Sequence, residues 1–141
     1  MSEDTVISDE LRNLLDVEFG PEVHEVEKGM VKKFAEAIDD SNPLWQKIVP
    51  PTFFAVLKLE ELYQKVRTAE CPLSRLLNGG SDLEYYQPIA VGDVVSVTGK
   101  VTGMRERVGK SGKMIFMILE MTYKNQSGEE VARLRQNLIR Y

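Results

Sequence analysis

The chain has 141 residues, enough for one compact domain, and its 43% hydrophobic and 28% charged residues are typical of a folded globular protein. The 18 basic and 22 acidic residues give a net charge of −4, which provides no general attraction to nucleic acid. A single cysteine, Cys71, excludes an internal disulfide and a cysteine cage for zinc. No secretory signal is visible in MSEDTVISDE, and no apolar run approaches the roughly 20 residues of a membrane span. We therefore expect a cytoplasmic domain without a metal or cofactor.

The N-terminal third is predicted to hold two helices and a short strand. A serine followed by leucines at helical spacing predicts a helix over residues 8–16. Gly20-Pro21 is predicted to end this helix, and the charged stretch 23–26 to form an edge strand. Apolar residues at i, i+3, i+4 and i+7 predict an amphipathic helix over 31–38, which ends in the turn-forming cluster 39–43.

Pro50-Pro51 opens the element that we expect to be the longest helix. Proline suits the first helical positions, because its missing N–H would have no partner inside the helix. The apolar side chains from Phe53 to Val66 cover more than half of the helix circumference. We therefore expect this helix to be buried on several sides, as if wrapped by a sheet.

After this helix the apolar pattern changes to that of β-strands. The predicted strands cover residues 82–89, 94–102, 114–119 and 131–141, with turns at 109–112 and 125–128. Every position from 114 to 119 is apolar, which indicates a central strand covered on both faces, and a second subunit is the simplest outer cover. The sequence thus predicts a single α+β domain over residues 1–141, with a curved antiparallel sheet wrapped around a long central helix. It also predicts a dimer or a dimer of dimers.

Several short segments follow one another in an order that is more specific than any one of them. They are residues 34–44 (FAEAIDDSNPL), 50–53 (PPTF), 77–80 (LNGG), 85–89 (YYQPI) and 91–93 (VGD). These segments resemble the MaoC-like dehydratases and (R)-specific enoyl-CoA hydratases, in particular their N-terminal dehydratase-type subgroup. The resemblance implies a hot-dog fold, a dimer that extends the sheet across two subunits, and a thioester substrate on coenzyme A or acyl carrier protein. The family's reaction is the reversible addition of water to a trans-2-enoyl thioester.

Active members of that family carry an Asp-x-Asn-Pro-x-His motif. Here Asp40, Asn42 and Pro43 match the motif, and Trp45 stands where the histidine should be. An indole N–H donates a hydrogen bond but does not exchange protons near neutral pH, so half of the acid–base pair is missing. The single histidine, His24, lies in a charged stretch far upstream, and we interpret it as a solvated side chain. We therefore expect the chain alone to be inactive.

Two further interpretations apply to the motif residues. Asp40 is either a remnant of the catalytic pair or a turn residue that bonds its own backbone. Asn42 is either a substrate contact or a turn-former. Trp45 either lines an acyl tunnel or belongs to the core.

The start of the expected central helix supplies a second candidate site. The free backbone N–H groups of Thr52, Phe53 and Phe54 lie at its positive end, which suits a thioester carbonyl that gains negative charge. The alternative is that these donors bond water or Asp40.

Basic residues supply a third candidate site. Arg105, Arg107 and Lys110 gather around one predicted hairpin, and Arg133, Arg135 and Arg140 lie on the last strand. Either these side chains dock the phosphates of the carrier, or they belong to an ordinary solvated strand face.

We interpret the chain as the acyl-thioester-binding, non-catalytic subunit of a heteromeric (3R)-hydroxyacyl-thioester dehydratase or enoyl-CoA hydratase. Its partner would be a MaoC-like catalytic subunit or a second copy of itself, and neither nucleic acid nor a membrane is expected. Two alternatives are an acyl-CoA thioesterase that uses Asp40, Glu60 or Glu61, and a non-enzymatic acyl-CoA binding module.

Overall fold

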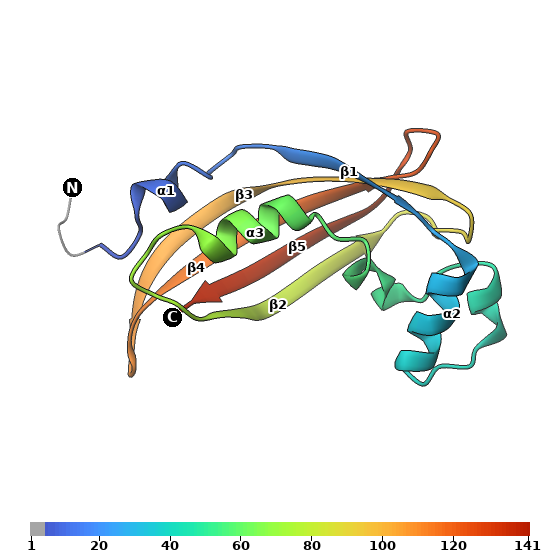
Figure 1. Cartoon of the computed structure of the whole chain (residues 1–141), viewed down its shortest axis with the longest axis horizontal. Coiled ribbons are helices and arrows are strands. Elements are labelled where there is room, and N and C mark those ends of the chain that lie inside the picture. Colours follow the sequence, from blue (N-terminus) through green and yellow to red (C-terminus); the bar gives the residue numbers. More distant parts are fainter. Residues whose placement is uncertain (1–4) are drawn as a thin grey trace.

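A curved antiparallel sheet holds a short helix against its inner face in the computed structural model, which describes residues 5–141 (Figure 1). In this part of the chain the sheet has five strands in the order β1-β3-β4-β5-β2, so β4 is central and β1 and β2 are the edges. The strands are β1 (Phe19–Glu25), β2 (Leu76–Tyr85), β3 (Val94–Gly109), β4 (Gly112–Lys124) and β5 (Glu130–Arg140). The helices are α1 (Asp9–Arg12), α2 (Lys28–Ala37) and α3 (Glu60–Thr68), with 3₁₀ turns η1 (Pro43–Gln46) and η2 (Pro51–Ala55). The predicted α+β class and antiparallel sheet are confirmed.

The long strands β3, β4 and β5 form the predicted meander. The first hairpin turns between Gly109 and Gly112, and in the second the Asn125 side chain accepts hydrogen bonds from two backbone amides of the turn. The strand predicted over 82–89 is β2, which begins earlier, at Leu76, and pairs with β5 at the far edge of the sheet. Its predicted end is wrong because the chain leaves the ladder after Tyr85.

Residues 5–141 bury one face of the sheet and leave the other face open. On β4 the inward side chains Ile115, Met117 and Leu119 are fully buried, whereas Phe116 and Ile118 on the outer face remain partly exposed. The prediction of a central strand is confirmed. The predicted cover on the outer face is not supplied by residues 5–141 themselves.

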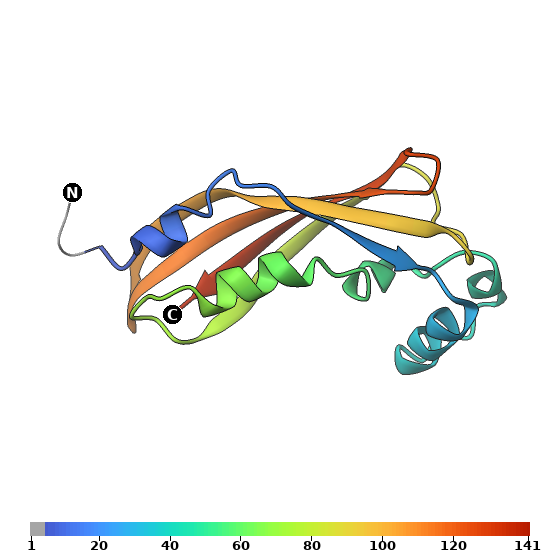
Figure 2. The ribbon, with the colours of Figure 1, turned by 45° about the horizontal axis from the view of Figure 1, so that its top comes forward.

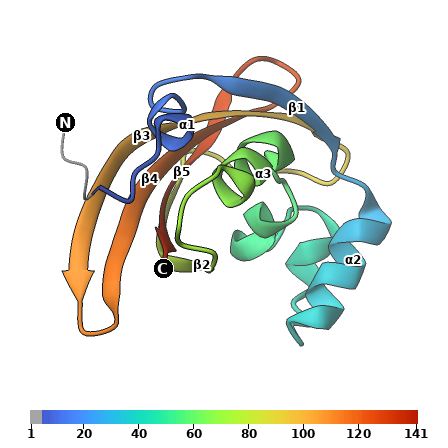
Figure 3. The same ribbon diagram turned by 60° about the vertical axis from the view of Figure 1, so that its left-hand side comes forward.

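The long central helix expected from Pro50 onward is not continuous. It is divided into the 3₁₀ turn η2 and the nine-residue helix α3, joined by residues 56–59. Leu57 and Leu59 are both 1% exposed, yet on a helix residues two apart point about 200° away from each other. The non-helical backbone of Leu59 (φ −105°, ψ 78°) lets both leucines face the core. Figure 3 shows α3 lying in the hollow of the sheet.

Two glycines make room for the side chain of Leu59 at the start of α3. A Cβ atom added at Gly20 would lie 3.1 Å from Leu59 Cδ1, and one at Gly99 would lie 3.1 Å from Leu59 Cδ2. The two glycines lie on the neighbouring strands β1 and β3. Leu59 therefore sits in a notch of the sheet that larger residues would fill.

The N-terminal elements differ in length from the prediction. Ser8 caps α1 as expected, since its hydroxyl accepts a hydrogen bond from the Leu11 amide, but the helix ends at Arg12. The chain leaves the helix because Leu15 forms a bridge with Val101 of β3. Gly20-Pro21 lies inside β1 at a bulge, so it does not end a helix, while the predicted edge strand is confirmed.

The helix α2 and the turn η1 lie beyond one end of the sheet (Figure 2). The predicted apolar stripe directs Val31 and Ala35 into the core, and the Phe34 ring meets Phe53 edge to face at 5.4 Å between centroids. In the part of the chain that the structure describes, every helix is too short or too polar to span a membrane.

Candidate functional site

The matched motif forms a cavity of about 510 Å³ between α2 and η1. Asp40 and Asn42 line this cavity, and both make contacts typical of a turn. The Asn42 amide donates to Asp40 Oδ1 at 3.1 Å, and the Leu44 amide donates to Asn42 Oδ1 at 3.0 Å. Both side chains therefore support the local backbone, and a catalytic role of Asp40 stays a prediction.

Trp45 lines the same cavity and also packs against the hydrophobic core. Its indole Nε1–H is buried and has no hydrogen-bond partner among residues 5–141. Leaving a buried donor without an acceptor costs about 1–3 kcal/mol. The indole thus holds an unpaired donor, and Asp40 lines the same cavity.

The expected donors at the start of the central helix are placed differently. Phe53 is fully buried, and its amide donates to Pro50 O at 3.0 Å, so it is not free for a ligand. Thr52 is exposed and Phe54 is half-buried, but both belong to the five-residue turn η2 rather than to an α-helix. The dipole of a long helix is therefore not available there.

The actual N-terminus of α3 is occupied by a side chain from β1. The Glu60 amide donates to Glu22 Oε2 at 2.8 Å, which satisfies one of the free donors of the helix. Glu60 and Glu61 are themselves exposed in the first turn. A carboxylate of the chain thus takes the place where an anionic ligand would bind.

His24 is not the solvated side chain that we expected. Its Nε2 lies 2.6 Å from the carbonyl oxygen of Lys58 and 3.7 Å from Glu22 Oε1, and the side chain is 17% exposed. The contact arises because β1 passes beside the segment that precedes α3, which brings residues 34 positions apart together. With Nε2–H donating to Lys58 O, His24 ties β1 to that segment.

A second cleft, of about 370 Å³, lies between α3, η2 and the inner face of the sheet. The Tyr63 hydroxyl donates to the Gln136 side-chain oxygen, and burial, only partly offset by this hydrogen bond, raises the pKa of Tyr63 to about 12. Tyr123 is 2% exposed and lines the cleft, yet its hydroxyl has no hydrogen-bond partner within residues 5–141. Burial, together with neighbouring Tyr63 and Tyr85, raises the pKa of Tyr123. Both phenols are thus neutral hydrogen-bond donors at neutral pH.

Phe54 and Glu60 line this cleft and are among the sequence-based candidates, whereas Tyr63, Tyr123 and Gln136 are not. Tyr123 and Gln136 could be recognised in the sequence as polar residues at inward-facing positions of a strand. Tyr123 faces the same side of β4 as Met121, and Gln136 faces the same side of β5 as Leu134 and Leu138. Buried polar groups are costly unless they are bonded, so such positions indicate a structural network or a ligand.

The predicted basic cluster lies at the opposite end of the sheet from α2, at the β3–β4 hairpin (Figure 1). The guanidinium groups of Arg105 and Arg107 lie 6.0 and 5.4 Å from the Phe116 ring centroid, and Lys110 is exposed in the hairpin. The structure therefore does not bring these residues to the cavity of Asp40.

Arg140 is not part of a surface patch. It is 5% exposed and points inward from β5. Its guanidinium donates to the carbonyl oxygens of Ala69 at 2.6 Å and of Leu73 at 2.7 Å, next to the C-terminus of α3. This side chain fastens the end of the helix to the sheet.

An antiparallel sheet curved around one helix, with a helix and an Asp-x-Asn-Pro turn at one end, defines the hot-dog fold of MaoC-like dehydratases. Solved structures confirm this class. The chain is similar to the ChsH1-ChsH2 complex from Mycobacterium tuberculosis, with a TM-score of 0.75, 15% identity and 88% coverage of both chains. It is also similar to the HadBC (3R-hydroxyacyl-ACP dehydratase) complex from the same organism, with a TM-score of 0.74, 16% identity, and coverage of 89% of this chain and 96% of the other.

The family model of the FAS1-like dehydratase domain region matches residues 13–134, and the chain belongs to this family. A UPF0336 protein from Thermobifida fusca is 30% identical over 125 residues, which cover 79% of this chain and 80% of that protein. A UPF0336 protein from Streptomyces avermitilis is 27% identical over 100 residues, or 61% and 67% of the two chains. The resemblance seen in the motifs is thereby confirmed.

Proposed function

We propose that this chain is the acyl-thioester-binding, non-catalytic subunit of a heteromeric (3R)-hydroxyacyl-thioester dehydratase. The observation that carries the proposal is that Asp40 and Trp45, the two ends of the motif, line one cavity. Hydration of an enoyl thioester needs one group to take a proton from water and another to protonate the carbon next to the carbonyl. Asp40 can serve as one of these groups, whereas the indole of Trp45 cannot serve as the other.

The single histidine of the chain does not replace the missing group. The Nε2 of His24 is held at the carbonyl of Lys58, on the segment between η2 and α3. A complete acid–base pair would therefore come from a partner subunit. Two of the similar structures, ChsH1-ChsH2 and HadBC, are named as complexes of two different chains, and HadBC is named as a 3R-hydroxyacyl-ACP dehydratase. These names support an arrangement of two different subunits.

The cleft beneath α3 is the proposed site for the acyl group and its carbonyl. Phe54 and Leu57 supply apolar walls, and the unpaired hydroxyl of Tyr123 supplies a donor for a carbonyl oxygen. A mostly apolar cleft with a few directed polar groups suits a small-molecule ligand. The thioesterase alternative has less support: Glu60 lines this cleft, but Glu60 and Glu61 are both exposed and Glu61 does not line it.

The test measures hydration of crotonyl-CoA by the purified chain alone and after co-expression with a MaoC-like subunit that has an intact Asp-x-Asn-Pro-x-His motif. We expect binding but no hydration by the chain alone, and hydration by the pair. Turnover of roughly 1–10³ per second by the chain alone would contradict the proposal. Release of free thiol from the same substrate would favour the thioesterase alternative instead.

A further inference from the structure

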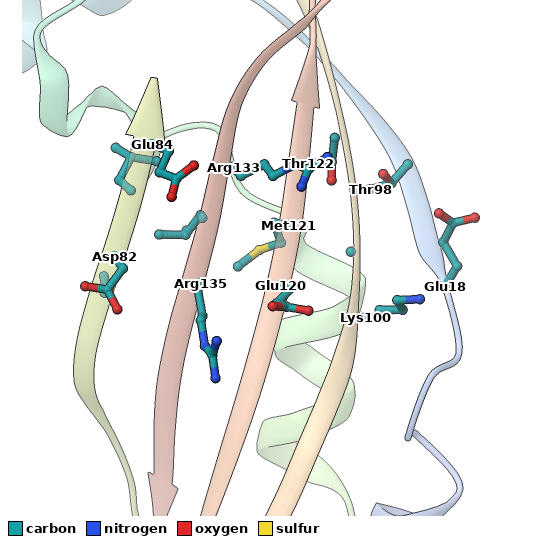
Figure 4. Close-up of a pocket in the computed structure, with 14 residues that line it drawn as sticks. Glu18, Asp82, Glu84, Thr98, Lys100, Glu120, Met121, Thr122, Arg133 and Arg135 are labelled. Carbon is teal, nitrogen blue, oxygen red and sulfur yellow. The ribbon is translucent and has the colours of Figure 1, made fainter. Parts of the chain in front are cut away.

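Four charged side chains form a ladder across the outer face of the sheet, away from α3 (Figure 4). They come from four adjacent strands in direct register, as Asp82 pairs with Arg135, Arg135 with Glu120, and Glu120 with Lys100. The charges therefore alternate in sign from β2 through β5 and β4 to β3. We call these four residues the charge ladder.

The residues of the charge ladder are exposed, and their charges form no ion pairs with residues 5–141. All four side chains are exposed, and none of them forms an ion pair within 4.0 Å with any of the residues 5–141. A hollow of about 830 Å³ lies over the ladder. The hollow leaves room for long side chains that arrive from another molecule.

An apolar patch continues from the charge ladder on the same face. Phe116, Ile118 and Ile139 point outward toward the hairpin end of the sheet and are only partly buried. Apolar side chains next to directed charges are typical of a protein–protein interface. The face thus offers both components that an interface needs.

We propose that a second copy of this chain binds to this face, with the two sheets back to back. The two-fold axis would run parallel to the strands, between β4 and β5. It would place Arg135 opposite Glu120 of the second copy, and Asp82 opposite Lys100 of the second copy. Because a two-fold interface repeats every contact, all four charges of each copy meet an opposite charge.

The same axis also matches the apolar patch. Ile139 on β5 and Phe116 on β4 are paired in register, so Ile139 of one copy would lie opposite Phe116 of the second copy, and Phe116 opposite Ile139. A two-fold axis perpendicular to the strands that passes through the charge ladder would instead place every ladder residue opposite itself, and like charges in contact oppose association. The alternating pattern therefore selects one orientation of the second copy.

This interface is separate from the one that the proposed function requires. The strand edges of β1 and β2 stay free when the outer faces meet, because the ladder residues project from the face of the sheet. A catalytic partner that extends the sheet could bind at the same time. The inference thus stands or fails independently of the missing acid–base group.

The test uses the full chain and charge reversals at the centre of the charge ladder, with the molar mass measured by sedimentation or light scattering. E120R places arginine opposite arginine across the axis, and R135E places glutamate opposite glutamate. We expect each variant to have half the mass of the wild type at the same concentration. An equimolar mixture of the two variants should restore the wild-type mass, because each unlike pair then has opposite charges.

Glu84→Arg is the matched control. It also puts an arginine beside a cross-strand arginine, Arg133, but under the proposed axis it faces Thr98 of the second copy. We expect it to keep the wild-type mass, and circular dichroism should show all three variants folded. A monomeric wild type at about 100 μM, or a mixture that stays at the mass of the single variants, would overturn the proposal.

Discussion

The Tyr63 hydroxyl donates a hydrogen bond to the Gln136 side-chain oxygen, across the cleft between α3 and β5. The amide nitrogen of Gln136 lies 3.4 Å from the Ser81 hydroxyl on β2, so one glutamine links the helix to two strands. Tyr123 stands beside this network with a hydroxyl that no residue from 5 to 141 engages. The cleft thus contains one phenol that stabilises the fold and one that is available to a ligand.

Removing these two hydroxyls should therefore have different effects. Tyr63→Phe should lower the free energy of unfolding by about 1–3 kcal/mol, because Gln136 loses its partner in a buried site. Tyr123→Phe should leave stability unchanged and weaken crotonyl-CoA binding about 2- to 10-fold, the value of one neutral hydrogen bond. Urea unfolding and calorimetric titration measure the two effects. Unchanged affinity in Tyr123→Phe would rule out the cleft as the carbonyl site.

The stability of the chain should fall in alkaline solution. Burial raises the pKa of Tyr63 to about 12, above the 10.0 of an exposed tyrosine, so the folded state keeps its proton longer than the unfolded state does. The stabilisation is complete below pH 10 and is lost between pH 10 and 12, at up to about 1.4 kcal/mol per pH unit for each such tyrosine. Urea unfolding from pH 8 to pH 11 measures this slope. The slope should be smaller in Tyr63→Phe, and an equal slope would show that other groups cause it.

Trp45→His restores the residue type that the motif lacks. We expect this variant to hydrate crotonyl-CoA measurably above the wild-type rate, because a positioned acid or base contributes about 10²–10⁴-fold. Trp45→Phe is the control, since it removes the indole N–H without adding a titratable group. Equal inactivity of both variants would mean that the cavity lacks more than an imidazole.

Ligand entry into the cavity of Asp40 can be followed directly. Trp45 is the single tryptophan of the chain, and it lines that cavity with its Nε1–H unbonded. We expect acyl-CoA to change the intensity or the wavelength of its emission, with coenzyme A alone as the control. If the emission spectrum of Trp45 stays constant at saturating acyl-CoA, acyl-CoA does not bind in the cavity of Asp40.

Arg140 should be a major contributor to stability, although it appears in sequence as one of several basic residues on the last strand. Arg140→Met should lower the free energy of unfolding by about 2–4 kcal/mol, since the buried carbonyl group of Ala69 and the partly buried one of Leu73 lose their donor. Arg67→Met, a change at an exposed residue of α3 that borders the cleft, should alter it by less than about 0.5 kcal/mol. Chemical denaturation compares the two variants. Similar small losses in both would contradict the anchoring role.

The sequence predicts the three strands of the meander well because their signal is local. The alternation along β3 and the apolar run of β4 report burial directly, and the turns between them contain glycine and asparagine. The division of the central helix is not predictable in this way. The apolar residues from Phe53 to Val66 are equally compatible with one long helix that is buried on all sides. Only the folded sheet shows that Leu57 and Leu59 face the same side, which a continuous helix does not allow.

The candidate site follows the same rule. The turn at Asp40 and Asn42 is encoded in adjacent residues, so the motif cavity lies where the sequence places it. The cleft of Tyr63, Tyr123 and Gln136 depends on three elements that meet only in the folded chain. Likewise, the hydrogen bond from His24 to the Lys58 carbonyl joins residues 34 positions apart, so no local sequence pattern predicts it.

The notch that Gly20 and Gly99 leave for Leu59 fixes where α3 rests along the sheet. A Cβ atom at Gly20 would lie 2.5 Å from the Val97 carbonyl oxygen, and one at Gly99 would lie 2.6 Å from Met121 Cγ, so a side chain at either position would disturb the sheet as well as Leu59. The place of α3, and with it the shape of the cleft, therefore depends on two glycines that lie outside the cleft lining. Substitutions at these glycines are therefore expected to change the cleft as much as substitutions among the residues that line it.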